Sequence, residues 1–257
     1  MKRTYQIREA RILTSALMAL AGPAYSAESD PPVFHYDRDG VAISVPTGWK
    51  EIPAAILKDY TDKLARLQPN APRQEFQGGF QLTSAEQWFT YPYVMIQIRN
   101  TGRVPEGQFT KSAGIHGAAE KGLKKAESQL STILSESKLT EPRYDPQKHA
   151  LFMNGSMNVA GVGKVRMTSA TLLSEKGTIS VYCYALEGDF AAYLKPFETM
   201  LNSVELSEEL RYKPRPSDTN AVLGFLDRVG SGALRGAIIG AIVVLVIFVM
   251  RRKNAVT

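Results

Sequence analysis

The fold of this chain is decided by three runs in its second half: HALFMNGSMNV at His149–Val159, KVRMTSATLL at Lys164–Leu173 and TISVYCYAL at Thr178–Leu186. Each run is rich in the β-branched, aromatic and other apolar residues that strands favour. The connections Ala160–Gly163 and Glu175–Gly177 contain glycine, which suits tight turns. Three strands joined by two short turns make an antiparallel meander, and we expect the rest of the fold to be built around it.

Further strands are predicted on both sides of the meander. In Val41–Val45, large apolar residues alternate with smaller ones, as in a strand with one buried face. The step Asp39-Gly40 before it suits a tight hairpin turn. The other predicted strands are Val33–Tyr36, Phe76–Leu82, Tyr93–Arg99 and Ser203–Leu206.

Three segments carry apolar residues at helical spacing, namely Ile52–Leu67, Ser112–Ser137 and Phe190–Leu201. Together with about seven strands in mostly hairpin order, they predict an α+β fold with an antiparallel sheet. Because several of the strands are apolar on both faces, we expect the helices to flank both sides of the sheet.

An uncharged apolar run, AIIGAIVVLVIFVM, occupies Ala237–Met250 and is followed at once by the basic residues 251–253. Residues from Gly232 extend this run, because Arg235 can place its charge among the lipid headgroups. From Gly232 the segment rises about 28 Å as a helix, close to the roughly 30 Å of a hydrocarbon core. We therefore predict one C-terminal transmembrane helix at 232–250.

Residues 1–27 have the pattern of a secretory signal peptide, with a basic start, the short apolar stretch Ile12–Gly22 and small residues after it. The alternative is an uncleaved signal anchor. A signal followed by a stop-transfer segment exports the middle of the chain, and the basic tail then faces the cytoplasm, as the positive-inside rule requires. We expect a type I protein of the bacterial inner membrane, with most of the chain in the periplasm.

The predicted division of the chain follows from these segments. It comprises a signal peptide at 1–27, an exported domain at 28–207, a linker and juxtamembrane segment at 208–231, a transmembrane helix at 232–250 and a cytoplasmic tail at 251–257.

The formal charge of +6 does not indicate a nucleic-acid binder. Residues 1–27 carry four basic side chains and one acid, and residues 251–257 carry three basic side chains and no acid, so the two ends account for the whole excess. The neutral remainder predicts no phosphate-binding surface and no nucleic-acid partner.

Five aromatic residues are the candidate ligand site. Trp88, Tyr91 and Tyr93 belong to the densest aromatic cluster in the chain, and Tyr182 and Tyr184 share one face of a predicted strand. Left uncovered, these rings would line a groove for a small ligand, glycan or peptide. The alternative is that they pack beneath a helix.

A second candidate is the stripe Gly232, Gly236 and Gly240, which places a small residue at every fourth position of the predicted transmembrane helix. Such a stripe permits close approach of two helices and predicts a homodimer through this face. The alternative is that glycine is common in membrane helices.

No catalytic residue, cofactor or metal site is predicted. Cys183 is the single cysteine and lies on the apolar face of its strand, where a thiol behaves as a small hydrophobe. His35, His116 and His149 are isolated from one another and from the cysteine, without the spacing of metal ligands.

Two stretches resemble PsbP-like domains, over about residues 33–207. Ile43-Ser-Val-Pro-Thr-Gly-Trp-Lys50, which runs into a helix, is similar to the strand-turn entry of that family. The helix Phe190–Leu201 followed by Asn202-Ser-Val-Glu-Leu206 looks like its closing helix and strand. The resemblance implies small accessory or binding proteins, several of them exported in bacteria, with no shared catalytic residues.

The expected function is therefore that of a membrane-anchored periplasmic binding or accessory domain, with a protein or small ligand as its partner. One alternative is a structural subunit of an inner-membrane complex. The other is an enzyme, which would bring two or more of His35, His116, His149, Cys183 and the carboxylates together in a pocket.

Overall fold

The computed structural model describes residues 33–67, 74–109, 112–216 and 218. The predicted signal peptide, transmembrane helix, cytoplasmic tail and glycine face Gly232, Gly236 and Gly240 lie outside these residues. Among the residues described, no helix is both long and apolar enough to cross a membrane. The membrane anchor stays a prediction from the sequence.

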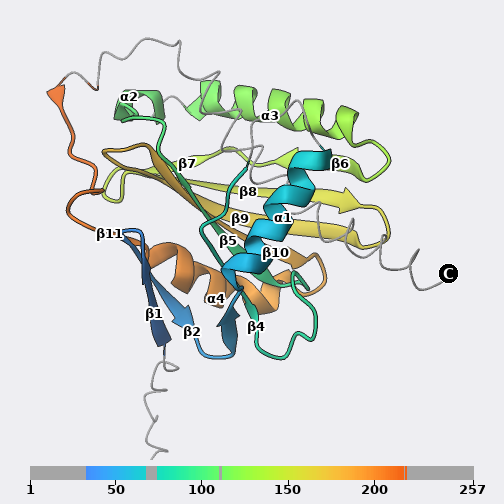
Figure 1. Cartoon of the computed structure of the whole chain (residues 1–257). Helices are drawn as coiled ribbons and strands as arrows, with labels where there is room; N and C mark the ends of the chain where they lie inside the picture. Colours follow the sequence, from blue (N-terminus) through green and yellow to red (C-terminus); the bar gives the residue numbers. More distant parts are fainter. Residues whose placement is uncertain (1–32, 68–73, 110–111, 217, 219–257) are drawn as a thin grey trace, which may run out of the picture. The chain divides into compact units, whose positions relative to one another are not determined.

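The predicted meander is confirmed and forms the middle of an antiparallel sheet (Figure 1). The strands of this sheet are β3 Trp49–Glu51, β4 Gly78–Leu82, β5 Tyr93–Arg99, β6 Leu134–Leu139, β7 Arg143–Asp145, β8 Ala150–Val159, β9 Gly163–Leu173 and β10 Thr178–Leu186. Their order is β3-β4-β5-β10-β9-β8-β6, with β7 beside β8. Strands β5 and β10 are therefore central, and both are almost wholly buried.

A second, smaller sheet contains β1 Val33–Arg38, β2 Val41–Pro46 and β11 Glu205–Leu206, in the order β1-β2-β11. Asp39 and Gly40 at the hairpin turn have φ angles of 56° and 76°. A two-residue hairpin loop with a type I′ turn needs such positive φ angles at both of its residues. The prediction of one sheet is wrong. The cause is the break after Pro46, since β2 stays in the small sheet while Trp49 starts a strand of the large one.

The described residues form four helices instead of the predicted three, namely α1 Ala54–Leu67, α2 Glu106–Phe109, α3 Ser112–Gln129 and α4 Phe190–Asn202. The helix predicted to run to Ser137 ends at Gln129. Its apolar period continues to Ile133, but Leu134–Leu139 is strand β6 and pairs with β8. This pairing satisfies backbone groups along β8 that a longer helix would leave open.

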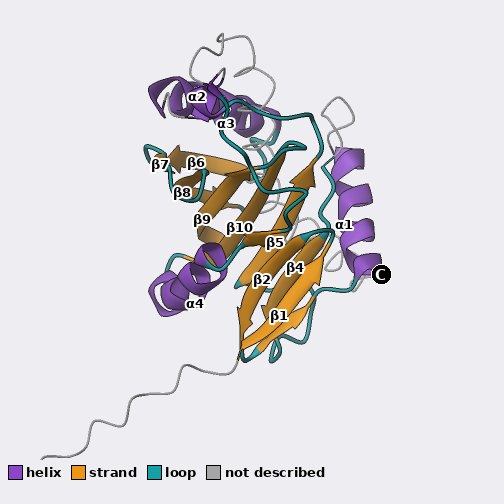
Figure 2. Ribbon diagram, turned by 90° about the vertical axis from the view of Figure 1, so that its left-hand side faces the viewer, coloured by secondary structure: helices purple, strands orange, loops and turns teal. Residues whose placement is uncertain are grey.

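Apolar side chains on the two faces of the large sheet belong to two different cores. Along β10, Tyr182 and Tyr184 belong to the core that α1 and α3 cover, whereas Val181 and Cys183 belong to the core with α4 and the small sheet. Figure 2 shows α1 and α4 on opposite sides of the strands. The expectation that helices flank both faces is confirmed.

Candidate functional site

The predicted aromatic set lies together on the face covered by α1 and α3. Tyr93 on β5 is directly opposite Tyr184 on β10, and the centres of their rings are 5.1 Å apart. Tyr182 stacks on Tyr184 at 6.4 Å. These three tyrosines are buried, while Trp88 and Tyr91 are partly buried against the same core.

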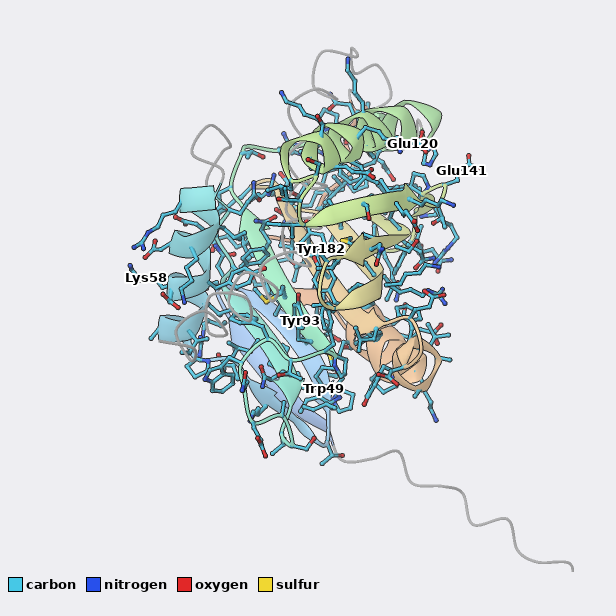
Figure 3. All side chains as sticks on the ribbon, turned by 90° about the vertical axis from the view of Figure 1, so that its right-hand side faces the viewer. Trp49, Lys58, Tyr93, Glu120, Glu141 and Tyr182 are labelled. Carbon is cyan, nitrogen blue, oxygen red and sulfur yellow. The ribbon has the colours of Figure 1, made fainter. Side chains whose placement is uncertain are left out.

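Helices α1 and α3 cover these rings with side chains such as Tyr60 and Leu123. In Figure 3, Tyr93 and Tyr182 are labelled over the sheet, beside α1 and below α3. Burial raises the pKa of Tyr93, Tyr182 and Tyr184 above that of an ordinary phenol, so all three are neutral. These three tyrosines therefore do not line an open groove. They pack beneath helices, the alternative interpretation of the same residues.

Polar side chains interrupt this apolar face. Alternate residues of β9 face the same way and read Met167, Ser169, Thr171 and Leu173. Met167 packs with the tyrosines, whereas Leu173 belongs to a separate apolar cluster. We call the polar side chains on this face the polar band; they are Gln74, Gln97, Arg99, Ser169, Thr171, Thr178, Ser180 and Tyr182.

Strand register places the middle of the polar band in one row. Ser180 on β10 is opposite Gln97 on β5 and opposite Thr171 on β9. The hydroxyls of Thr171 and Ser180 share a hydrogen bond of 3.0 Å, and the Tyr182 hydroxyl donates to Gln97 Oε1 at 3.5 Å. Ser169 Oγ donates to a backbone carbonyl at 3.2 Å. These hydrogen bonds offset the cost of burying the groups.

Arg99 is the one charged member of the polar band. Its Nε donates to Gln97 Oε1 at 2.8 Å, and its Nη2 donates to Gln74 Oε1. Gln97 is itself fixed, because its Nε2 donates to Gln74 Oε1 at 3.0 Å and to the Glu75 carbonyl at 3.2 Å. Burial lowers the pKa of Arg99 below the ordinary guanidinium value. The cation is therefore partly removed from water and held in one orientation by two amides.

A second polar cluster fastens residues 207–216 and 218, which we call the exit strap. Leu210, Tyr212 and Asp218 of this segment are buried, and Arg211 forms a β-bridge with Ser174. The segment predicted as a linker from 208 therefore begins with residues that pack on the domain. Its remainder, 219–231, lies outside the described residues.

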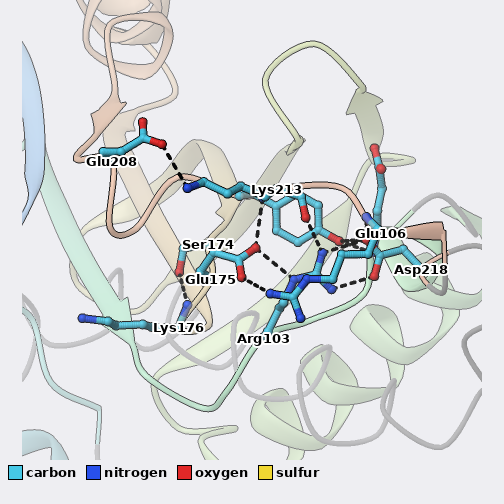
Figure 4. A network of polar contacts seen from close by, with 10 residues as sticks. Arg103, Glu106, Ser174, Glu175, Lys176, Glu208, Lys213 and Asp218 are labelled. Atoms are coloured by element: carbon cyan, nitrogen blue, oxygen red, sulfur yellow. Dashed lines mark hydrogen bonds and ion pairs between the residues drawn. The ribbon is translucent and has the colours of Figure 1, made fainter.

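Arg103 is the centre of the contacts that hold the exit strap (Figure 4). Besides the Asp218 carboxylate, its guanidinium donates to Glu175 Oε1 at 3.0 Å and to the Lys213 carbonyl at 2.8 Å, and it lies 4.4 Å from the centre of the Tyr212 ring. The side chains of Arg103 and Asp218 are 14% and 4% exposed, so water screens the pair little. Hydrogen bonds from Arg103 hold the pKa of Asp218 well below its usual range.

A pocket of about 340 Å³ opens beside the exit strap. The strap contributes Arg211 and Tyr212 to its walls, the end of α4 contributes Asn202, and the segment before β8 contributes Lys148 and His149. Lys148 Nζ donates to the carbonyl of Asn202 at 3.1 Å and to its Oδ1 at 2.8 Å. The pocket thus joins distant parts of the sequence at the place where the strap begins.

The fold brings the side chains of His149 and Glu106 into contact. His149 Nδ1 is 3.1 Å from Glu106 Oε1, and the Tyr144 hydroxyl donates to the same oxygen at 2.6 Å. The His149 ring also packs on Tyr212, with 5.1 Å between ring centres. Two of the residues that the enzyme alternative requires are therefore in contact, and one of them, His149, lines the pocket.

The other residues of that alternative lie elsewhere. Cys183 is buried in the core with α4, and burial raises the pKa of its thiol well above the ordinary value, which keeps it protonated. His116 on α3 is 3.8 Å from Glu120, and His35 lies in β1 opposite Ser44. In the described part of the chain, no three His, Cys, Asp or Glu side chains are placed to hold a metal ion.

The residues that carry the two polar clusters were not predicted from the sequence. A signal for Gln97 and Arg99 was present, since both continue the alternation that begins with Tyr93 and Met95 on one face of β5. No comparable local signal exists for Arg103, because its partner Asp218 is 115 residues away.

Comparisons with known proteins give the fold alone. No protein-family model matches the chain, and no curated protein matches it. The structure is similar to the solution structure of cyanobacterial PsbP (CyanoP) from Synechocystis sp. PCC 6803, with a TM-score of 0.45 and 11% identity, over 72% of this chain and 98% of that one. It is also similar to the crystal structure of LpqN, involved in cell envelope biogenesis of Mycobacterium tuberculosis, with a TM-score of 0.36 and 12% identity, over 68% of this chain and 90% of that one. The resemblance to PsbP-like domains is confirmed at the level of fold.

Proposed function

We propose that this chain is a binding or accessory domain of the bacterial cell envelope, held at the inner membrane by a helix at 232–250 with its folded part in the periplasm. The observation that carries the proposal is the position of the 340 Å³ pocket, which is bordered by the exit strap. The strap is the part of the chain that leads toward the predicted helix. A partner bound in this pocket would therefore be held near the membrane surface.

The walls of the pocket suit binding. Leu172, Val204 and Leu206 supply apolar surface. Lys148 and Arg211 supply positive charge, and Glu205 supplies one negative charge. Apolar walls with a few placed polar groups are typical of sites for small ligands and peptide segments. The contacts of Arg103 with the strap fix one of these walls, so the pocket is formed before a partner arrives.

Labelling of single cysteines tests the location. Asn202→Cys places a thiol at the pocket, and Asn254→Cys places one in the predicted cytoplasmic tail. The native Cys183 is buried, so it should not react with the label. In intact spheroplasts a membrane-impermeant maleimide is expected to label residue 202 at once and residue 254 only after permeabilisation. Labelling of both positions, or of neither, before permeabilisation would contradict the proposed topology.

Crosslinking tests the role. A photoreactive maleimide on Asn202→Cys in native membranes is expected to give a discrete product that the same label on Lys58→Cys does not give. Lys58 is a suitable control because its side chain is 75% exposed on α1 and does not line the pocket. Identical products from both positions would contradict a binding role for the pocket. Turnover in a substrate screen that His149→Ala abolishes would favour the enzyme alternative.

The homodimer through Gly232, Gly236 and Gly240, and with it the role of a structural subunit, stays a prediction. Substitution Gly236→Ile is expected to abolish self-association in detergent if this face packs against a second helix. Unchanged association would remove the face from consideration.

A further inference from the structure

We propose that the polar band contains a second binding site, in which Arg99 binds the carboxylate of a small organic acid. The site lies on the sheet beneath α1 and α3, apart from the pocket beside the exit strap. It depends neither on the membrane anchor nor on that pocket, so the two proposals can fail separately.

Arg99 has no carboxylate partner among the residues that the structure describes. Its guanidinium donates only to the neutral amide oxygens of Gln97 and Gln74. Arg103, by contrast, contacts the two carboxylates Glu175 and Asp218. A cation placed among buried groups without a counter-ion opposes folding. A bound anion would offset that cost, which gives the fold a reason to retain the charge.

One edge of the Arg99 guanidinium makes no hydrogen bond to the described residues. Gln97 and Gln74 engage Nε and Nη2, which form the side edge of the fork, and Nη1 donates to none of the described residues. The end of the fork, with Nη1 and the second hydrogen of Nη2, matches the two oxygens of a carboxylate. Because the two amides already fix the plane of the guanidinium, binding costs little additional side-chain entropy.

The neighbours of Arg99 indicate the class of anion. Arg99 is partly exposed at the end of β5, so part of its side chain is in contact with solvent. Thr178 on β10 is directly opposite Arg99. The next row carries the hydroxyls of Ser180 and Thr171, and the row after it carries the Tyr182 ring. A single cation among neutral hydroxyls and a ring suits a monoanion with an apolar or aromatic body. A phosphate dianion would need a second cation, which the polar band does not have.

Benzoate is a suitable probe, and benzamide is its neutral control of nearly equal shape. Thermal unfolding of the full-length protein in a nonionic detergent is followed with each compound, and inorganic phosphate forms a third arm. We expect benzoate to raise Tm in a saturable way, whereas benzamide has little effect. Equal shifts from benzoate and benzamide, or a shift from phosphate alone, would overturn the assignment of a carboxylate site.

Three variants separate binding from folding. Arg99→Met is expected to abolish the response to benzoate while leaving the ligand-free Tm unchanged or higher, because it removes an uncompensated charge. Arg99→Lys keeps the charge but loses the fork, and should weaken benzoate binding about tenfold or more. Arg143→Met is the matched control, since Arg143 lies over the Phe152 ring outside the band and should not affect binding.

Two results would show that Arg99 has only a structural role. One is a lower ligand-free Tm in Arg99→Met together with no response of the unmodified protein to benzoate. The other is an unchanged response to benzoate in Arg99→Met, which would place the bound anion elsewhere.

Discussion

Both terminal nitrogens of the Arg103 guanidinium donate to the Asp218 carboxylate, Nη1 to Oδ1 at 2.6 Å and Nη2 to Oδ2 at 2.7 Å. This two-pronged pair joins the segment after β5 to the far end of the exit strap. The Tyr212 hydroxyl donates to the same carboxylate at 2.9 Å and accepts from the Glu106 amide at 2.8 Å. The strap is thereby tied to α2 as well as to Arg103.

Asp218→Asn is expected to lower the free energy of unfolding by about 2 kcal/mol at neutral pH, because it removes charge-assisted hydrogen bonds in a shielded position. The pKa of Asp218 is lower in the folded than in the unfolded protein. Its stabilising effect is therefore complete above the unfolded pKa, near 4, and is lost as the pH falls toward the folded pKa. Denaturant titrations at several pH values should show the difference from the unmodified protein narrowing only below about pH 4.

The matched control is Glu208→Gln, in the same strap but with a side chain that is 67% exposed. It should change stability little at any pH. An Asp218→Asn protein as stable as the original at pH 7 would contradict the proposed contribution of the pair.

Arg103→Lys should loosen the exit strap, because an ammonium group cannot hold Asp218, Glu175 and the Tyr212 ring at once. Trypsin reports this release by cutting after Arg211, since Lys213 and Arg215 each precede a proline. We expect cleavage to become about tenfold faster. This corresponds to a loss of about 1.4 kcal/mol in the free energy of opening the strap, since the cleavage rate follows the population of the open form. Arg66→Lys at the end of α1 is the control, and equal cleavage rates in both variants would count against the strap contacts.

Gly177→Ala should destabilise the protein by about 3 kcal/mol. Gly177 has a φ of +152°, and a Cβ added there would lie 1.9 Å from the backbone oxygen of Arg99. Gly117→Ala should instead stabilise it by up to about 1 kcal/mol, because that glycine is inside α3 and a Cβ would meet nothing within 4 Å. Melting temperatures of the two variants should move in opposite directions, and a shift of the same sign in both would refute the argument.

Cys183 should resist alkylation in the native protein and react fully in denaturant. Its thiol is buried, and the raised pKa leaves almost no thiolate at neutral pH. Iodoacetamide labelling followed by mass spectrometry measures both rates. The Asn202→Cys variant is the positive control, since its exposed thiol should react in the folded state. Comparable native rates at residues 183 and 202 would show that the β10 core opens readily.

The sequence predicted the meander well because its strands are long, strongly apolar and separated by glycine-containing turns. It failed at Leu134–Leu139, where Ala126, Leu130 and Ile133 continue a helical period and conceal the start of β6. Periodicity describes a segment alone, whereas β6 forms because β8 offers it backbone partners. The short strand β3 and helix α2 are too brief to give a periodic signal.

For the predicted aromatic groove, the sequence could give the shared face of the tyrosines but not the burial of their rings. Tyr93, Tyr182 and Tyr184 do share one face, as strand alternation requires, but their exposure depends on where α1 and α3 pack. Strand alternation places Gln97 and Ser180 on this same face, but it does not show that they are buried, because polar residues at alternate positions are equally typical of a solvent face. The sequence did not predict that the exit strap packs on the domain, because its prolines and charges are typical of a linker. Tyr212 and Asp218 are held there by contacts with Arg103, which is distant in the sequence.

The exit strap also limits the length of the linker between the folded domain and the predicted membrane helix. Between Asp218 and Gly232 lie residues 219–231, which even fully extended reach no more than about 45–50 Å. Detaching the strap back to Leu206 would lengthen that reach by about 40 Å. If the predicted helix anchors the chain, opening the Arg103–Asp218 contact would therefore nearly double the distance from the membrane that the folded domain can reach.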